Sequence, residues 1–419
     1  MHTLCFLDPG HFHAALTLRE ASPRVADEIY VYAPEGPELR AFLELVDRFN
    51  RRPERPTRWR PVVRLGDDPL VRLLADRPGD AVALAGRNGG KAHAIRRLHD
   101  AGLHVLADKP WLVEPGDLGD IRAALSGWPL AMEIMTGRHD GAAEVARRLV
   151  GDPGVLGALP DDGAPSIEQT SVHYLDKRVD GAPLRRPAWF FDVRVQGEGV
   201  VDIPTHLVDQ VQWLLEDRGG PPGETPQLVA ARGWSTRVPV DAFSRITGEP
   251  AFPPALAPWV ENGALAYRCN AELAYRLAGV TVRANTRWDL APPPGGSDTH
   301  ALIVRGDRAE VRLEQGPHTG HRRRVQVVPR PGGPGVEGAL RDALARWQAD
   351  LPGVGAAPMG EVGGYEMSVP AARQGGHESH FPLVLEDFLA AIDEGHWLAA
   401  RAERTAAKYA LLAAAAAGR

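Results

Sequence analysis

The sequence predicts an α/β protein in two parts, a doubly wound parallel sheet followed by an α+β domain with a large, mostly antiparallel open sheet. Two observations predict this arrangement. In residues 1–135, short apolar stretches alternate with stretches of helical periodicity, which indicates parallel strands joined by crossover helices. After about residue 150, apolar residues alternate with polar ones as they do in half-buried antiparallel strands.

The first part alternates strand and helix in a regular order. A helical stretch begins at His13, and another ends at Gly102, a suitable residue for the position after a helix. This order is typical of a Rossmann-like domain, which we assign to residues 1–135. Strands are predicted at 2–8, 27–33, 80–86, 103–107 and 129–135, and further helices at 37–49, 91–102 and 117–125.

The second part contains strand-like segments separated by loops rich in glycine and proline, such as "APPPGG" and "PRPGGPG". We assign residues 136–380 to an α+β domain. Residues 381–419 are predicted to be helices that return to the N-terminal domain, and the alanine-rich tail suits a helix because alanine is the best helix former. Strands are predicted at 166–175, 188–196, 227–234, 299–306 and 309–315, and closing helices at 381–395 and 399–417.

Composition excludes several classes of function. The net charge of −6 gives no reason to expect nucleic acid or an anionic membrane as a partner. We find no apolar run long enough to span a membrane. Cys5 and Cys269 form no CxxC pair, so neither a zinc knuckle nor a redox pair is expected. The chain begins with a strand rather than a signal peptide. We therefore expect a cytoplasmic protein.

The first strand is followed by the loop "FLDPGHFHAAL". Dinucleotide-binding loops carry GxGxxG between strand and helix, and here the three glycine positions hold Asp8, Gly10 and His13. Gly10 is the glycine that lets the backbone approach a pyrophosphate. We expect His11, Phe12 and His13 to line a cofactor crevice, although a plain turn is the alternative. The two histidines have no evident third ligand, so no metal is expected.

Two further strand ends carry candidate cofactor-binding residues. An acid that binds the ribose 2′-hydroxyl is expected near Ala33, and Glu35 is the nearest acid. NAD is favoured over NADP because no arginine cluster follows; Arg40 is the nearest arginine. Asn88 follows the strand at 80–86, at the sheet edge where ligands bind; a turn asparagine is the alternative.

The stretch "GVVDIPTHLVDQVQWLL" (199–215) combines a helix start with ionisable side chains. Pro204 suits the first helical turn. Asp202 precedes it, and His206, Asp209 and Trp213 fall on one side of the helix. A helix N-terminus disfavours a charged imidazole, so His206 is suited to accept a proton. The alternative is an aspartate cap followed by an amphipathic helix with a half-buried histidine.

Together these motifs resemble the Gfo/Idh/MocA family of NAD(P)-dependent oxidoreductases. "AGLHVLADKPW" resembles the family's AGKHVLxEKP stretch, and "GEGVVDIPTHLVDQVQWLL" its GGGxxxDxxxHxxDxxxWL stretch. "EIMTGRHDGAAEVARRLV" resembles the segment that leads from the first domain into the second. "HFHAAL", "VHYLDKRVDG" and "RRPAWFFDVRVQGEG" resemble a subgroup described only as oxidoreductases with a distinct C-terminal domain.

The resemblance implies roles for particular residues. Lys109 matches the lysine that polarises the reacting oxygen, and the bond to Pro110 is often cis in this family. Asp108 replaces the usual glutamate and would hold the nicotinamide ribose. His206 would be the general base for hydroxyl oxidation, and Asp202 would orient the substrate or His206. These residues are also expected to contact substrate or cofactor directly.

The chain departs from the family pattern in the loops that bind the cofactor. Two fingerprint glycines are absent, TPN reads Gly86-Arg87-Asn88, and the histidine after it is Lys91. On the second domain, "SVHYLDKRVDG" places His173 and Lys177 where they could bind a polyhydroxylated substrate. An ordinary solvent-exposed sheet face is the alternative.

The predicted function is transfer of a hydride between NAD(P) and a CHOH carbon of a sugar, cyclitol or glycoside. Two alternatives remain. An NAD-dependent glycosidase would oxidise its substrate transiently, eliminate the aglycone and re-reduce the product, and a ligand-sensing protein would keep the fold without turnover. The resemblance implies a homodimer or homotetramer formed through the C-terminal sheet, and a small carbohydrate-like molecule as the partner.

Overall fold

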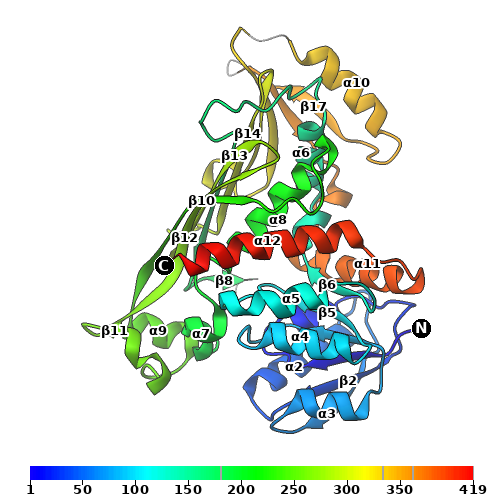
Figure 1. The fold of residues 1–419 in the computed structure, drawn as a ribbon, viewed down its shortest axis with the longest axis vertical. Coiled ribbons are helices and arrows are strands. Elements are labelled where there is room, and N and C mark those ends of the chain that lie inside the picture. Colours follow the sequence, from blue (N-terminus) through cyan, green and yellow to red (C-terminus); the bar gives the residue numbers. More distant parts are fainter. Residues whose placement is uncertain (180–181, 333–334, 361–362, 419) are drawn as a thin grey trace. The chain divides into compact units, whose positions relative to one another are not determined.

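The computed structural model describes residues 1–179, 182–332, 335–360 and 363–418. Asp180 and Gly181 of the predicted "VHYLDKRVDG" motif, Gly333 and Pro334 of the predicted "PRPGGPG" loop, and Arg419 of the tail lie outside the described residues. The chain divides into two compact units (Figure 1). Unit 1 comprises Met1–His139 and Gly375–Ala413, and unit 2 comprises Asp140–Gln374 and the residues after Ala413.

Unit 1 contains a six-stranded parallel sheet in the order β3-β2-β1-β4-β5-β6. The strand order reverses between β1 and β4, which is the switch point at which such sheets bind ligands. The predicted doubly wound sheet is therefore confirmed. Its elements are β1 (Leu4–Leu7), α1 (His13–Leu16), β2 (Glu28–Ala33), α2 (Pro37–Arg51), β3 (Arg60–Leu65), α3 (Pro69–Asp76), β4 (Ala81–Leu84), α4 (Lys91–Asp100), β5 (His104–Asp108), α5 (Leu118–Ala124), β6 (Ala131–Ile134), α11 (Phe381–Asp393) and α12 (Ala399–Ala417).

The core of unit 1 explains why its strands are continuously apolar. Every residue of β1, β4 and β5 is buried, as expected for a parallel sheet covered on both faces. Helix α2 buries Leu39, Phe42, Val46 and Phe49 against this sheet, residues spaced three or four apart on one helical face. Helix α11 packs on the same core, so a segment from the end of the chain completes the N-terminal unit.

A buried polar cluster fixes α12 to the sheet. The Lys408 ammonium lies 2.5 Å from a Glu133 carboxylate oxygen, and both side chains are buried. Tyr409 donates a hydrogen bond to the other Glu133 oxygen, and its hydroxyl accepts one from the Trp111 backbone N–H at 2.8 Å. Burial and the adjacent Glu133 raise the pKa of Tyr409. The Glu133 carboxylate therefore links strand β6 to helix α12, and the Tyr409 hydroxyl links α12 to the loop after β5.

Unit 2 is built on a ten-stranded sheet in the order β10-β12-β13-β7-β14-β15-β16-β18-β17, with β11 paired to β12. Only the β7–β13 pair is parallel, so the predicted mostly antiparallel sheet is confirmed. Helices α6 and α8 pack against the sheet. The elements are α6 (Gly141–Gly151), β7 (Ile167–Tyr174), β8 (Arg178–Val179), β9 (Ala182–Pro183), α7 (Val193–Gln196), α8 (Pro204–Leu214), β10 (Gln227–Pro239), α9 (Val240–Thr247), β11 (Val260–Glu261), β12 (Ala264–Leu277), β13 (Val280–Asp289), β14 (Thr299–Arg305), β15 (Ala309–Gln315), β16 (Arg324–Pro329), α10 (Glu337–Trp347), β17 (Gly355–Pro358) and β18 (Tyr365–Ser368).

The strand predicted at 188–196 is wrong. The segment forms a 3-10 helix followed by α7, because the Asp192 side chain accepts a hydrogen bond from the Arg194 N–H and caps α7. The apolar residues that suggested a strand pack in an aromatic cluster instead, with the Phe191 ring 5.1 Å from that of Tyr267. The helix expected from His13 is only one turn long.

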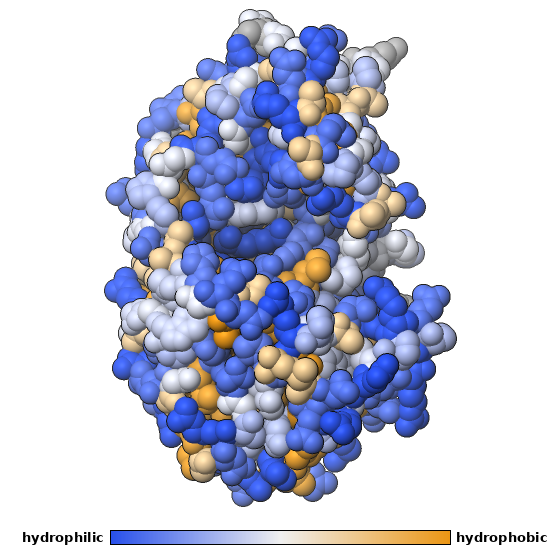
Figure 2. All heavy atoms as spheres, turned by 90° about the vertical axis from the view of Figure 1, so that its right-hand side faces the viewer, coloured by the Kyte–Doolittle hydropathy of each residue, from blue (hydrophilic) through white to orange (hydrophobic). Residues whose placement is uncertain are grey.

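Among the described residues, no helix is both long and apolar enough to cross a bilayer. Figure 2 shows one face of the molecule, on which hydrophilic side chains predominate and apolar residues occur in small groups.

We predict that Lys408→Met destabilises the protein by about 3–5 kcal/mol, because it leaves the Glu133 carboxylate buried without its counter-ion. The free energy of unfolding from urea denaturation measures this, with the transition of unit 1 followed separately if two transitions occur. The control is Arg96→Gln, which removes an exposed ion pair with Asp100 and should cost less than about 1 kcal/mol. Equal effects of the two substitutions would contradict the role of the buried pair.

Candidate active site

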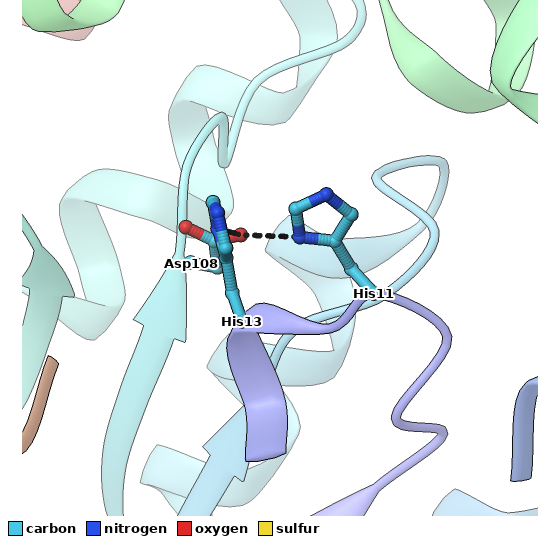
Figure 3. Close-up of side chains that lie close together, drawn as sticks. All are labelled: His11, His13 and Asp108. Atoms are coloured by element: carbon cyan, nitrogen blue, oxygen red, sulfur yellow. Dashed lines mark hydrogen bonds and ion pairs between the residues drawn. The ribbon is translucent and has the colours of Figure 1, made fainter. Parts of the chain in front are cut away.

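The ends of β1 and β5 bring three ionisable side chains together in unit 1. Asp108 is the last residue of β5. His11 lies in the loop after β1, and His13 is the first residue of α1. Figure 3 shows both imidazole rings directed at the Asp108 carboxylate. The distance from Oδ2 of Asp108 to Nδ1 is 2.9 Å for His13 and 3.6 Å for His11. No third partner for the two histidines was evident in the sequence, and the fold supplies Asp108.

Contacts from several elements hold this group in place. The Lys109 backbone N–H donates to Oδ1 of Asp108 at 3.0 Å, which leaves Oδ2 facing the imidazoles. Lys91, at the start of α4, is buried; its ammonium donates to the Asp108 carbonyl at 2.9 Å and to the Asn88 side chain. The His13 ring lies against Phe381 at 4.5 Å between centroids. The Lys109–Pro110 peptide is cis, as the resemblance implies.

Burial and proximity shift the pKa values of this group. Burial lowers the pKa of His13 to about 4, with a further contribution from His11, while Asp108 opposes the shift. Burial alone would raise the pKa of Asp108, but His13 and His11 outweigh it and hold that pKa well below its ordinary value. At neutral pH the group therefore combines an ionised carboxylate with a neutral His13 imidazole.

The loop after β1 packs closely against the residues that follow β4. A Cβ added to Gly86 would lie 2.3 Å from the Asp8 carbonyl oxygen. Asp8 has a φ of 41°, a left-handed conformation that aspartate tolerates better than most residues. The Arg87 guanidinium lies 3.3 Å from Asp8 and 2.9 Å from Glu38. Gly86, which the sequence comparison treated as a departure, thus provides the close approach of two loops.

One predicted cofactor-binding residue, Glu35, lies apart from this group. Glu35 follows β2, is exposed, and pairs at 3.8 Å with Arg40. Phe12 lies beside the histidines in the chain, but its side chain is exposed. Gly10 lies in the first loop, and its N–H donates to the Asp8 carbonyl at 2.7 Å. The Phe12 ring nevertheless packs 4.5 Å from the His11 ring and 4.6 Å from the His13 ring. Gly10 lies beside the switch point between β1 and β4, whereas Glu35 follows β2 on the other side of β1.

In unit 2 the start of α8 places Asp202 and His206 as predicted, with Pro204 in the first turn. Asp202 is buried and lies one residue before the N-cap, so it is not the cap itself. The buried Arg186 guanidinium lies over the Trp288 ring at 5.3 Å. Burial lowers the pKa of Arg186, an effect that Asp202 and other nearby groups oppose. Arg186 is a residue of this site that sequence reasoning missed.

The predicted substrate residues form a second cluster on the sheet of unit 2. Asp298 Oδ2 lies 3.2 Å from His173 Nδ1 and 2.5 Å from the Lys177 ammonium. Ser171 Oγ lies 2.7 Å from His173 Nε2 and 2.8 Å from His300 Nδ1. The strands β7 and β14 pair Ser171 directly with His300. The structure therefore joins His173 and Lys177 through Asp298.

Charge balance within this cluster is set by burial and by its cations. Burial alone would raise the pKa of Asp298, but His173 and Lys177 outweigh it and lower that pKa. Burial lowers the pKa of His300 well below its ordinary value, and His173 adds to the effect. The Asp298 carboxylate, the Lys177 ammonium and the imidazoles of His173 and His300 thus form one polar cluster. These groups can both donate and accept hydrogen bonds.

Comparison with known proteins identifies the family. A model of the "Putative oxidoreductase C terminal domain" matches residues 145–418. A solved oxidoreductase from Parabacteroides merdae is 34% identical, with 99% of this chain and 96% of that chain covered and a TM-score of 0.94. This chain belongs to that family of oxidoreductases. Its matched C-terminal domain agrees with the subgroup of oxidoreductases that the sequence motifs resemble.

More distant structures share the fold of this oxidoreductase. Levoglucosan dehydrogenase in complex with NADH and levoglucosan is 15% identical, with coverage of 99% and 97% of the two chains and a TM-score of 0.60. A Sinorhizobium meliloti structure described as a myo-inositol dehydrogenase is 14% identical, with coverage of 100% and 98% and a TM-score of 0.55. No curated protein matches the oxidoreductase chain.

We predict that Gly199→Ala destabilises the oxidoreductase by about 1–3 kcal/mol through overpacking. A Cβ at Gly199 would lie 2.2 Å from the Cys269 carbonyl carbon of β12, so β12 or the segment leading to Asp202 must move. The thermal unfolding midpoint measures the effect. Gly338→Ala, in helix α10 with its nearest atom 3.9 Å away, should leave stability unchanged or raise it by up to about 1 kcal/mol. A tolerated Gly199→Ala would refute the close-packing explanation.

Proposed function

We propose that the oxidoreductase transfers a hydride between NAD(P), with NAD favoured, and a CHOH carbon of a sugar, cyclitol or glycoside. The observation that carries this proposal is the reversal of strand order between β1 and β4, with the first loop, Asn88 and the Asp108–Lys109 pair at neighbouring carboxyl ends of the strands. Open α/β sheets bind ligands at that position. The dehydrogenase described in complex with NADH and levoglucosan supports the choice of cofactor and substrate class.

The residues of the first loop fit a dinucleotide. Gly10 carries no side chain, and the His13 imidazole, although it replaces a glycine, is turned to Asp108 and Phe381 inside unit 1. Asp8, Gly10, His11 and Phe12 would border the pyrophosphate and Glu35 the adenosine ribose. Asn88, Asp108 and Lys109 would border the nicotinamide half. When bound, the nicotinamide supplies the hydride acceptor or donor.

The protein's own residues would handle the proton and the charge. Lys109 would stabilise the negative charge that develops on the reacting oxygen, because an ammonium in a closed site acts with little screening. His206 would accept the hydroxyl proton, since the N-terminus of α8 disfavours the imidazolium form. Asp202 would orient the substrate or the His206 ring.

The sheet cluster of unit 2 supports a polyhydroxylated substrate. His173, Lys177 and Asp298 are hydrogen-bonded to one another through Asp298, and Ser171 joins His300 to His173. Sugar hydroxyl groups both donate and accept, so they can replace such mutual contacts one for one. A hydrophobic substrate that displaced one of these contacts would leave a polar group without a partner, at a cost of about 1–3 kcal/mol for each group.

We predict that NAD⁺ and NADH raise the thermal unfolding midpoint more than NADP⁺ and NADPH do. A ligand that binds only the folded state adds about 2.7 kcal/mol of stability at a concentration 100 times its Kd. Absorbance of the purified protein first shows whether cofactor has been carried through. Gly10→Val should abolish the shift by blocking the approach to the pyrophosphate. The control is Gly116→Val, at an open position.

The outcome separates the alternatives. No shift with any of the four nucleotides, in a cofactor-free preparation, would overturn the proposal and favour a ligand-sensing protein. Release of an aglycone from a glycoside without net NADH would favour the redox-recycling glycosidase.

We predict that Lys109→Met and His206→Gln each lower turnover by about 10²–10⁴-fold, because the first removes the charge that stabilises the reacting oxygen and the second removes the proton acceptor. Turnover is followed by the absorbance of reduced nicotinamide with a panel of sugars and cyclitols. The nucleotide-induced shift in the unfolding midpoint should persist in the His206 variant. The control is His318→Gln, an exposed histidine 3.4 Å from Glu314. Full activity in either catalytic variant would remove that residue from the mechanism.

A further inference from the structure

We propose that His11, His13 and Asp108 bind a divalent transition-metal ion of the zinc type and leave at least one coordination position open to an oxygen atom of a small molecule. The three residues each offer one ligand atom, and these atoms all lie within 4.8 Å of one another. The proposal goes beyond hydride transfer, and it holds whether or not a nucleotide binds.

The donor set selects the class of ion. Two imidazoles and one carboxylate are the protein ligands of many catalytic zinc sites and of non-haem iron(II) sites, both of which keep open positions. Magnesium and calcium prefer sites made of oxygen ligands alone. His11 and His13 therefore favour zinc, cobalt(II) or iron(II) over the alkaline-earth ions.

The spacing suits a single ion. Bonds of about 2.0–2.1 Å in a tetrahedral zinc site place the ligand atoms about 3.3–3.4 Å apart. The distances from Asp108 Oδ2 to the Nδ1 atoms of His13 and His11 are 2.9 and 3.6 Å, one on each side of that value. Side-chain movements of a few tenths of an ångström would bring each imidazole nitrogen to that separation from the carboxylate oxygen.

The ligands are carried by segments that are fixed independently. Asp108 ends β5, and the Lys109 N–H engages its other carboxylate oxygen at 3.0 Å. The His13 ring is wedged against Phe381 and lies 5.7 Å from the His377 ring. His11 is held through its backbone N–H, which donates to the Ala85 carbonyl at the end of β4 at 3.0 Å. Sites on such supported elements keep the geometry that a metal requires.

The location suggests what the ion would do. It would lie at the carboxyl edge of the sheet, beside the backbone of Lys109, where ligands of this fold bind. An open coordination position there would take a hydroxyl or carbonyl oxygen of a substrate and polarise it. His13, which stands at a fingerprint glycine position, would then join His11 and Asp108 in holding a Lewis acid at the site.

The test uses the full-length protein after removal of metal with a chelator. Cobalt(II) is titrated in, and its visible absorption reports coordination by nitrogen and oxygen ligands. We expect one equivalent to bind and zinc to displace it. The metal content of the protein as first purified, measured by mass spectrometry, gives an independent readout.

His11→Gln, His13→Gln and Asp108→Asn should each weaken cobalt binding by more than roughly 100-fold, because loss of an outer-shell partner alone costs 10–100-fold. Of the three substitutions, His11→Gln should disturb folding least, because the His11 side chain is partly exposed. Its thermal unfolding midpoint, measured in the absence of metal, shows whether the variant is folded. The controls are His93→Gln, an exposed histidine 3.5 Å from Asp120, and His300→Gln, from the buried cluster of unit 2.

The results decide the proposal clearly. Binding of one equivalent that the three ligand variants lose and the two controls keep supports it. Absence of a cobalt spectrum in the unaltered protein would overturn it and leave the three side chains as a hydrogen-bonding group. Unchanged binding in the folded His11→Gln protein would overturn it as well, and loss of binding in His300→Gln would move the metal site to unit 2.

Discussion

The structure of the candidate site depends on the need to satisfy one buried carboxylate. An ionised group removed from water must be paired or hydrogen-bonded, and Asp108 meets this need with contacts from three segments. His13 approaches from α1, His11 from the preceding loop, and Lys109 through its own backbone. Lys91 adds a contact from α4 to the Asp108 carbonyl. The carboxyl ends of β1, β4 and β5 are thereby drawn to one point.

A second buried carboxylate, that of Glu133, helps to hold the loop that follows β5. Glu133 joins Lys408 and Tyr409 of α12, and the Tyr409 hydroxyl accepts the backbone N–H of Trp111. The stretch "LADKPW" is therefore divided by function. Its aspartate and lysine lie at the ligand-binding edge of the sheet, whereas Trp111 is fully buried and anchors them. A helix close to the C-terminus thus helps to fix a site formed by the N-terminal sheet.

Hydrophobic periodicity predicted five of the six strands of the parallel sheet and both closing helices, because burial on one face or both leaves a direct pattern in the sequence. It did not predict the long strands β12 and β13 of unit 2. It failed at 188–196, where aromatic clustering and the Asp192 cap override strand propensity. The motifs singled out Lys109, Asp202 and His206 as candidates, and they did not point to Asp298 or His300. Those two depend on the register between β7 and β14, which pairs His300 with Ser171, and no local pattern reports that register.

The altered fingerprint shows how a glycine requirement can move within a fold. Close approach of the first loop to β4 needs a residue without a side chain, and here Gly86 on the β4 side meets that need, with the Asp8 carbonyl 2.3 Å from where a Cβ would be. His13 can then occupy a glycine position of the first loop, since its ring turns to Asp108 rather than outward. The loop thereby carries two imidazoles that both approach the carboxylate of Asp108, which lies 95 positions after His13 in the chain. A loop with all three fingerprint glycines would offer only backbone groups to a phosphate. Here His11, His13 and Asp108 add imidazole and carboxylate ligand atoms. The same edge of the sheet therefore supports both the nucleotide proposal and the metal proposal.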